Sequence, residues 1–382
     1  MALSTPALKD MVSELIGTPS VSSTQADIDQ SNSEVIDLLA NWLDPLGFHI
    51  TISPIENKPG KSNLIARIGS GRDGLLLSGH SDTVPFDEHL WHSDPLKVVE
   101  QDDKWFGLGS CDMKSFFAIA IEAAKPFLGT QLNHPLVIMA TADEESSMCG
   151  AKQLRPDQLD DVSHAVIGEP TDLKPINRHK GIMMLRLRIE GASGHSSNPQ
   201  KGNNAIEGMH AALSELMRYR DELRVKFQDA NFEVPYPTLN FGCIHGGDNP
   251  NRICDHAELE FDFRNLPSMD MTGFTADLQH RIDKKISGEG FTCQLELLHS
   301  PVPAFENSSS AMTFEVEQLV GEECGSVAFG TEAPFLKKLG IDTVVIGPGS
   351  INQAHQPNEF LSLNQIPPAI DLLQNLIKRH CL

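Results

Sequence analysis

Short apolar runs alternate with helical patterns over the first 170 residues, and this alternation restricts the fold more than any other feature. The runs cover residues 63–68, 75–81, 136–141 and 165–168. Each is short enough for a strand, whereas apolar residues recur at the helical period in 31–47 and 115–128. Strands that alternate with helices predict an α/β layer fold.

The pattern changes after Pro170. Residues 183–190 and 257–263 alternate apolar with charged side chains, which predicts strands with one buried face, and a helical pattern lies between them. A buried-strand run returns at 344–346, before a closing helix. The middle of the chain is therefore predicted to be a domain inserted into the first, with the segments 1–179, 180–293 and 294–382.

Length and composition agree with two water-soluble domains. The chain has 382 residues, and single cores stop growing near roughly 250–300 residues. No run approaches the roughly 20 apolar residues of a membrane span. The net charge of −22 disfavours nucleic acid and anionic membranes as partners. The absence of an apolar signal core and of any CxxC pair predicts a cytoplasmic protein with reduced thiols.

One nucleotide-binding pattern can be dismissed. Residues 69–74 match GxGxxG, but that fingerprint must open a helix, whereas a second strand pattern follows here. We interpret the glycines as a hairpin turn.

Acids and histidines follow the predicted strands. His80 and Asp82 end one run, Glu144 and Glu145 follow another, and Glu169 follows a third. Each has an ordinary alternative, such as a hydrogen-bonded His–Asp pair or a solvated acidic turn.

Two further candidates lie in loops. Asp112 precedes a helix and could be its N-cap, and His355 could be a surface residue. An ordinary role explains each of these residues alone, but such roles do not explain why all of them occur together with the strand-end residues. Two imidazoles and three carboxylates, from His80, Asp112, Glu145, Glu169 and His355, suit two zinc ions that share a bridging carboxylate.

Four motifs in this order resemble the family of acetylornithine deacetylase and succinyl-diaminopimelate desuccinylase over nearly the whole chain. They are His80-Ser-Asp82-Thr-Val-Pro85, Gly109-Ser-Cys-Asp112-Met-Lys114, Asp143-Glu144-Glu145 and Gly168-Glu169-Pro170. The resemblance implies a mixed sheet with helices on both faces, an inserted α+β lid and dimerisation domain, and two Zn²⁺ ions per subunit, with Co²⁺ as a possible substitute.

The same resemblance implies a role for each residue of the predicted site. Asp112 would bridge the two ions, with His80 and Glu169 on one and Glu145 and His355 on the other. Glu144 would be the general base. Asp82 would orient His80.

The middle segment carries further matches. Gly191-Ala-Ser-Gly194-His195 resembles the motif that supplies a histidine to the partner's active site in a homodimer. Arg264 resembles a carboxylate-binding arginine, although a surface salt bridge is the alternative. Asn251, Gly330 and Thr331 are expected to contribute substrate contacts.

The expected reaction is metal-dependent hydrolysis of the N2-acetyl amide of N-acetyl-L-ornithine, a step of arginine biosynthesis. The loop 330–335 and residues 178–181 resemble the deacetylases more than the desuccinylases. The alternatives are another N-acyl amino acid hydrolase (a desuccinylase, an aminoacylase or a carboxypeptidase) or an inactive metal-binding homologue.

Overall fold

The computed structural model describes residues 5–288 and 290–382, which form two compact units. The first contains Met1–Asn177, Asn307–Gly325 and Thr331–Leu382, and the second contains Arg178–Glu306 and Ser326–Gly330. The predicted boundary at 293 falls inside strand β14 (Thr292–Leu297), which pairs with a strand of the second unit. That unit therefore continues to Glu306. Within the described residues, no helix is long and apolar enough to cross a membrane.

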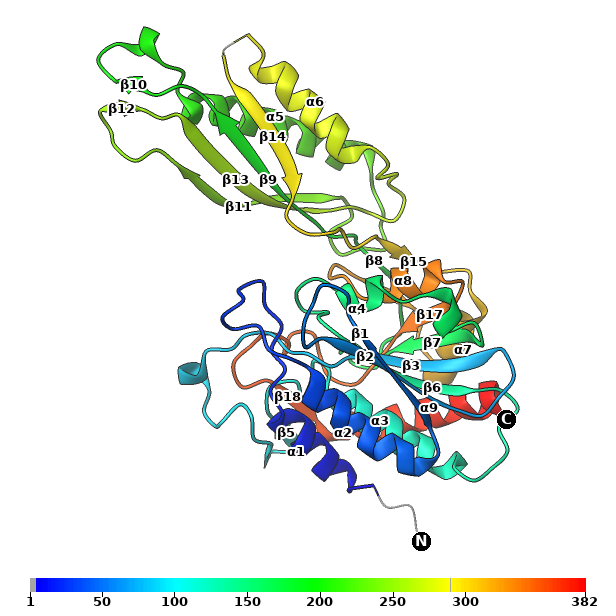
Figure 1. Ribbon diagram of the computed structural model, residues 1–382. Coiled ribbons are helices and arrows are strands. Elements are labelled where there is room, and N and C mark those ends of the chain that lie inside the picture. Colours follow the sequence, from blue (N-terminus) through cyan, green and yellow to red (C-terminus); the bar gives the residue numbers. More distant parts are fainter. Residues whose placement is uncertain (1–4, 289) are drawn as a thin grey trace. The chain divides into compact units, whose positions relative to one another are not determined.

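The first unit is built on a mixed sheet with the strand order β1-β2-β6-β3-β7-β17 (Figure 1). These strands are β1 (His49–Pro54), β2 (Ser62–Ile68), β3 (Gly74–His80), β6 (Leu136–Thr141), β7 (Val162–Ile167) and β17 (Asp342–Val345). β6, β3, β7 and β17 are mutually parallel, whereas β1 and β2 are antiparallel to their neighbours. Every residue of β3 and β6 is buried, which explains their unbroken apolar runs.

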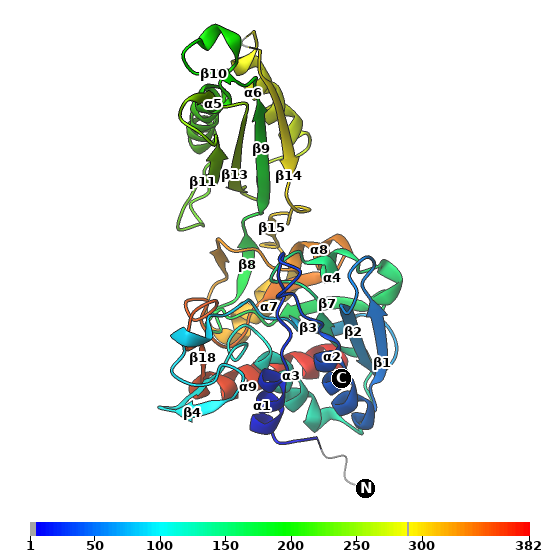
Figure 2. The same ribbon diagram turned by 60° about the vertical axis from the view of Figure 1, so that its left-hand side comes forward.

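Helices cover both faces of this sheet, as the resemblance implied (Figures 1 and 2). One face packs against α2 (Ser33–Leu43), α3 (Ser115–Ala124) and α9 (Ile366–Cys381). α1 (Leu8–Gly17) packs on α3, and a single apolar core joins all four helices. α7 (Ala311–Val320) joins this core, while α4 (Cys149–Lys152) and α8 (Ala333–Lys338) lie on the opposite face. β4 (Val99–Gln101), β5 (Lys104–Phe106) and β18 (Phe360–Ser362) form a separate small sheet.

The predicted hairpin at residues 69–74 is wrong. β2 and β3 are consecutive in the chain, but β6 lies between them, antiparallel to β2 and parallel to β3. The glycine-rich segment is still a turn between two strands, with Gly69 and Gly71 at positive φ. The strand that separates β2 from β3 comes about 60 residues later, beyond the reach of a local pattern.

The second unit contains an antiparallel sheet with the order β11-β13-β9-β14. The strands, besides β14, are β9 (Met183–Glu190), β11 (Thr238–Gly246) and β13 (His256–Arg264). On β9, Leu185 and Leu187 are buried, while Arg186 and Arg188 form ion pairs with glutamates of neighbouring strands on the other face. This division explains the alternation in the sequence.

Two helices, α5 (Ala205–Lys226) and α6 (Phe274–Ile286), cover the apolar face of that sheet. A two-stranded ribbon of β10 (Gly194–His195) and β12 (Arg252–Ile253) belongs to the same unit. β8 (Ile176–His179) carries the chain between the units and pairs with β15 (Phe305–Glu306) and β16 (Gly325–Val327).

Candidate metal centre

The predicted strand-end residues belong to the parallel part of the first unit's sheet. β3 ends at His80, which pairs in register with Thr141 at the end of β6, and β7 ends two residues before Glu169. Because the carboxyl ends of parallel strands lie along one edge of a sheet, the residues that follow them are brought together.

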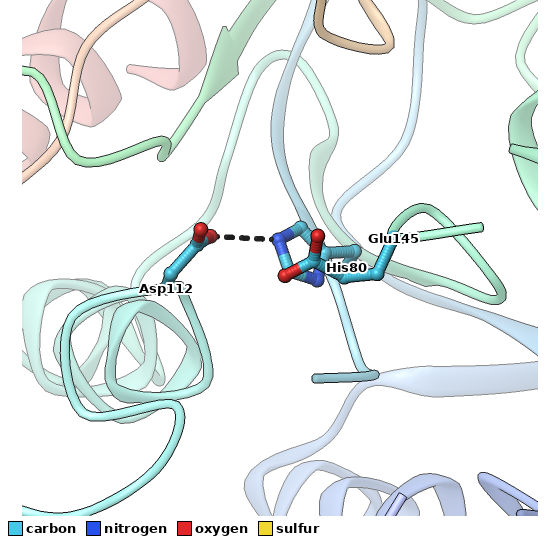
Figure 3. Close-up of side chains that lie close together, drawn as sticks. All are labelled: His80, Asp112 and Glu145. Carbon is cyan, nitrogen blue, oxygen red and sulfur yellow. Dashed lines mark hydrogen bonds and ion pairs between the residues drawn. The ribbon is translucent and has the colours of Figure 1, made fainter. Parts of the chain in front are cut away.

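His80, Asp112 and Glu145 lie with one potential ligand atom each within 4.8 Å of one another. Figure 3 shows the Asp112 carboxylate facing the His80 imidazole. Asp112 Oδ1 is 3.0 Å from His80 Nε2, and Asp112 Oδ2 is 3.6 Å from His355 Nε2. The same His355 nitrogen is 2.9 Å from Glu145 Oε2. Asp112 therefore lies between two imidazoles and directs one oxygen toward each.

The loop that carries Asp112 does not use this side chain as a helix cap. α3 begins at Ser115 after Lys114, and no side-chain hydrogen bond caps it. The alternative that Asp112 is an N-cap is thus excluded, and both of its oxygens face the cluster.

Asp82 connects His80 to the acidic loop after β6. Its buried carboxylate accepts hydrogen bonds from the backbone N–H groups of Glu144, at 3.2 Å, and Glu145, at 3.1 Å. His80 Nδ1 is 3.1 Å from the Asp82 carbonyl oxygen and 3.6 Å from its carboxylate. Asp82 thus fixes the backbone of the two glutamates as well as lying beside the histidine.

The electrostatics of the cluster fit a bound cation. Burial raises the pKa of Glu144 and Glu169 well above the ordinary glutamate value, and neighbouring carboxylates raise it further. Burial and the charge of Asp112 also raise the pKa of Glu145. Among the described residues, Glu145 Oε1 is buried without a hydrogen-bond partner. Imidazole and carboxylate are ligands that zinc accepts, so this donor set suits a metal that would offset the crowded negative charge.

Burial alone would lower the pKa of His80, but its hydrogen bonds to Asp112 and Asp82 hold that pKa well above its ordinary value. The two aspartates therefore favour a positive charge at this position.

The first acid of the loop, Asp143, is not part of the cluster. It has a positive φ of 62° and forms ion pairs with Lys58, at 3.3 Å, and Lys61, at 3.4 Å. Two lysines therefore stabilise the Asp143 carboxylate, which does not need a metal for this. The sequence feature that could have indicated this pairing is Lys61, which stands directly before the strand β2.

Two buried glutamates near the cluster, Glu332 and Glu359, were not among the predicted residues. Glu359 accepts hydrogen bonds from backbone N–H groups of the Asp112 loop. Glu332 accepts a hydrogen bond from Thr141 Oγ1 at 2.8 Å, and burial raises its pKa to about 7. Thr331, beside it, is fully buried. Glu359 lies close to His355 in the sequence, and Glu332 follows Thr331. No other local sequence pattern marks either glutamate as part of a site.

The remaining predicted residues belong to the second unit. His195 is exposed on β10, and its Nδ1 accepts a hydrogen bond from the Ser197 backbone N–H at 3.2 Å. Asn251 lies next to this ribbon, where its carbonyl accepts the Ser196 N–H at 3.1 Å. Arg264 pairs with Asp262 at 2.8 Å on β13, and Gly330 ends the unit.

Comparisons with known proteins agree with this geometry. Residues 76–379 match the family described as peptidase family M20/M25/M40. A protein named acetylornithine deacetylase from Pasteurella multocida is 50% identical over 98% of each chain. One of the same name from Proteus mirabilis is 46% identical over 100% of this chain and 99% of its own.

Solved structures show the same fold. A tripeptidase from Staphylococcus aureus has a TM-score of 0.76 and 21% identity over 97% of each chain. A dinuclear metal-binding peptidase of the M20 family from Bacillus subtilis has a TM-score of 0.70 and 14% identity over 98% of each chain. The chain therefore belongs to peptidase family M20/M25/M40 and, within it, to the family of the acetylornithine deacetylases.

Proposed function

We propose that this hydrolase cleaves the N2-acetyl amide of N-acetyl-L-ornithine to give L-ornithine and acetate. The relatives that match over their full length carry the name of this activity. The observation that supports it most directly is the position of Asp112 between His80 and His355, beside Glu145. The reaction would supply ornithine for arginine biosynthesis in the cytoplasm.

The proposed cofactor is a pair of Zn²⁺ ions, for which Co²⁺ could substitute. Asp112 would contribute to both sites, His80 and Glu169 to one, and Glu145 and His355 to the other. When bound, the metal pair supplies Lewis-acid chemistry, which polarises the acyl carbonyl and makes a water more acidic.

Glu144 is the proposed general base. Its side chain is half-buried beside the cluster, and its backbone N–H is fixed by Asp82. The Glu144 carboxylate would accept a proton from the attacking water and return it to the nitrogen of the departing amine. In the metal-free protein, burial raises the pKa of this carboxyl.

His195 is the proposed donor to the oxyanion that forms on the acyl carbonyl. A backbone N–H is always a donor, so the Ser197 N–H requires an unprotonated Nδ1 on His195. The tautomer that accepts at Nδ1 carries its proton on Nε2, from which it would donate to the oxyanion. We propose that this happens in trans, across a homodimer.

Four residues are proposed to contact the substrate. Arg264 would bind the α-carboxylate, although its Nε already donates to Asp262. A guanidinium has further N–H groups available for a carboxylate. Asn251, Gly330 and Thr331 would complete the contacts.

A substrate panel tests the assignment. We expect kcat/KM for N-acetylornithine to exceed that for N-succinyl-diaminopimelate by at least about tenfold, because the predicted contacts provide no second basic group for the succinyl carboxylate. Glu144→Gln protein, purified in parallel, measures contaminating host activity. A preference for the succinyl compound or for a dipeptide would overturn the substrate assignment.

A mixing experiment tests the trans role of His195. Inactive Glu144→Gln and His195→Ala proteins are unfolded and refolded together, so that half of the dimers are mixed. Each mixed dimer regains one site of two, which predicts about a quarter of wild-type activity. No recovery would refute the trans assignment, provided that mixed dimers form and wild-type protein refolds normally.

A further inference from the structure

Glu359 occupies an unusual position behind the Asp112 loop. The residue is 2% exposed. Oε1 accepts hydrogen bonds from the backbone N–H groups of Cys111, at 2.7 Å, and Asp112, at 2.9 Å, and Oε2 accepts one from Gly109 at 3.0 Å. Both oxygens are thus engaged by the backbone of the loop that presents Asp112.

These three partners are all N–H groups, which can only donate. A carboxylate can accept from all of them, whereas a glutamine amide must direct its NH₂ group at one of them. The glutamine oxygen could keep the hydrogen bonds from Cys111 and Asp112. Its NH₂ group would then face the Gly109 N–H, and two donors would oppose each other. The loop is therefore built around a carboxylate and not merely around a side chain of this size.

Glu359 also joins two loops that are distant in sequence. It follows His355 by four residues, and its own carbonyl oxygen accepts the Gly107 N–H at 3.0 Å. The strands beside these loops, β5 and β18, pair with each other, and Phe360 lies opposite Phe106. His355 has a positive φ of 59°, a conformation that the surrounding contacts must maintain.

We infer that Glu359 is a positioning residue that holds the Asp112 and His355 loops at the spacing the metal centre requires. The inference rests on the proposed function, because it assumes that both residues are ligands. Glu359 cannot itself be a ligand in this arrangement, since its oxygens accept from the backbone. It satisfies the N–H groups that would otherwise compete for the Asp112 carboxylate.

A metal titration of Glu359→Gln protein tests this inference. Metal-free wild-type and variant proteins are titrated with Zn²⁺ against a chromophoric chelator. We expect the variant to bind the same number of ions with roughly 10- to 100-fold lower affinity, the usual effect of losing a group that orients a ligand. Its Co²⁺ form should show an altered visible absorption spectrum, and excess Zn²⁺ should restore part of its activity.

Glu317→Gln is the matched control. Glu317, on α7, also accepts a backbone N–H, from Cys324 at 2.7 Å. Its substitution should leave the Zn²⁺ affinity and the Co²⁺ spectrum unchanged. Equal affinity of the Glu359→Gln and wild-type proteins would overturn the inference alone. If wild-type protein bound no metal, the proposed function would fail as well.

A second variant decides the question if Glu359→Gln does not fold. Glu359→Asp keeps the charge but withdraws the carboxylate by one methylene, so that it cannot reach all three N–H groups. Reduced Zn²⁺ affinity in folded Glu359→Asp protein would support the inference. Wild-type affinity would refute it.

Discussion

Lys61 is the buried cation on which the acidic loop depends most directly. Its side chain is 1% exposed, and Nζ lies 2.9 Å from Asp29, 3.4 Å from Asp143 and 2.9 Å from Ser22 Oγ. Lys58 also pairs with Asp143, but its side chain is 35% exposed. Lys61→Met would therefore leave two carboxylates without their buried partner.

The expected cost follows from this burial. Removing one partner of a buried ion pair costs about 3–5 kcal/mol, and we take about 3 kcal/mol because Lys58 remains. For a domain of 150–250 residues, each kcal/mol shifts the unfolding temperature by about 2–4 °C, so Lys61→Met should lower it by about 6–12 °C. The zinc affinity should fall too, since Asp143 precedes Glu144 and Glu145.

Differential scanning calorimetry of metal-free protein measures the effect on the first unit. The loss of stability in the double variant Lys61→Met/Asp143→Asn should be smaller than the sum of the losses in the two single variants, because the double variant removes both charges. Lys97→Met is the control, since it breaks an exposed ion pair with Asp94, which solvent screens, and should change stability little. A Lys61→Met shift no larger than that of Lys97→Met would refute the reasoning.

Three further predictions address other residues. Glu144→Gln should retain metal and lose at least roughly 10²-fold in kcat, whereas Glu145→Gln should weaken metal binding; metal analysis and kinetics would show the reverse if the roles are exchanged. Ser115→Ala should stabilise the protein by about 1 kcal/mol in thermal unfolding, because the buried hydroxyl has no hydrogen-bond partner among the described residues. Burial lowers the pKa of His179 to about 4. Because the unfolded chain then binds a proton that the folded one does not, stability should be complete above about pH 6.5 and decline toward about pH 4. Urea unfolding of His179→Phe should show a shallower dependence on pH over this window.

Local sequence patterns predicted the strand-end part of the candidate site. Uninterrupted apolar runs identify buried strands, and parallel strands place their carboxyl ends on one edge, so His80 and Glu145 could be expected near each other. The alternation in residues 183–190 likewise predicted a sheet with one apolar face, which β9 confirms.

The supporting contacts could not be predicted in the same way. Glu359 is separated from Gly109 by 250 residues, and no periodic pattern encodes such a contact. Two other features also depend on strand pairings between distant segments. These are the position of β6 between β2 and β3 and the extension of the second unit beyond residue 293. Whether a lysine such as Lys61 is buried depends on the carboxylates around it, which come from distant segments.

We expect this chain to hydrolyse N-acetylornithine at a metal pair built on Asp112, and one titration tests this directly. Chelated protein is titrated with Zn²⁺, and the initial rate of acetate release from N-acetylornithine is followed at each addition, for wild-type and Asp112→Asn proteins. Wild-type activity should return and reach its plateau at about two ions per subunit, whereas the variant should neither bind the pair nor recover. Full activity in the chelated protein, or in Asp112→Asn, would contradict this expectation.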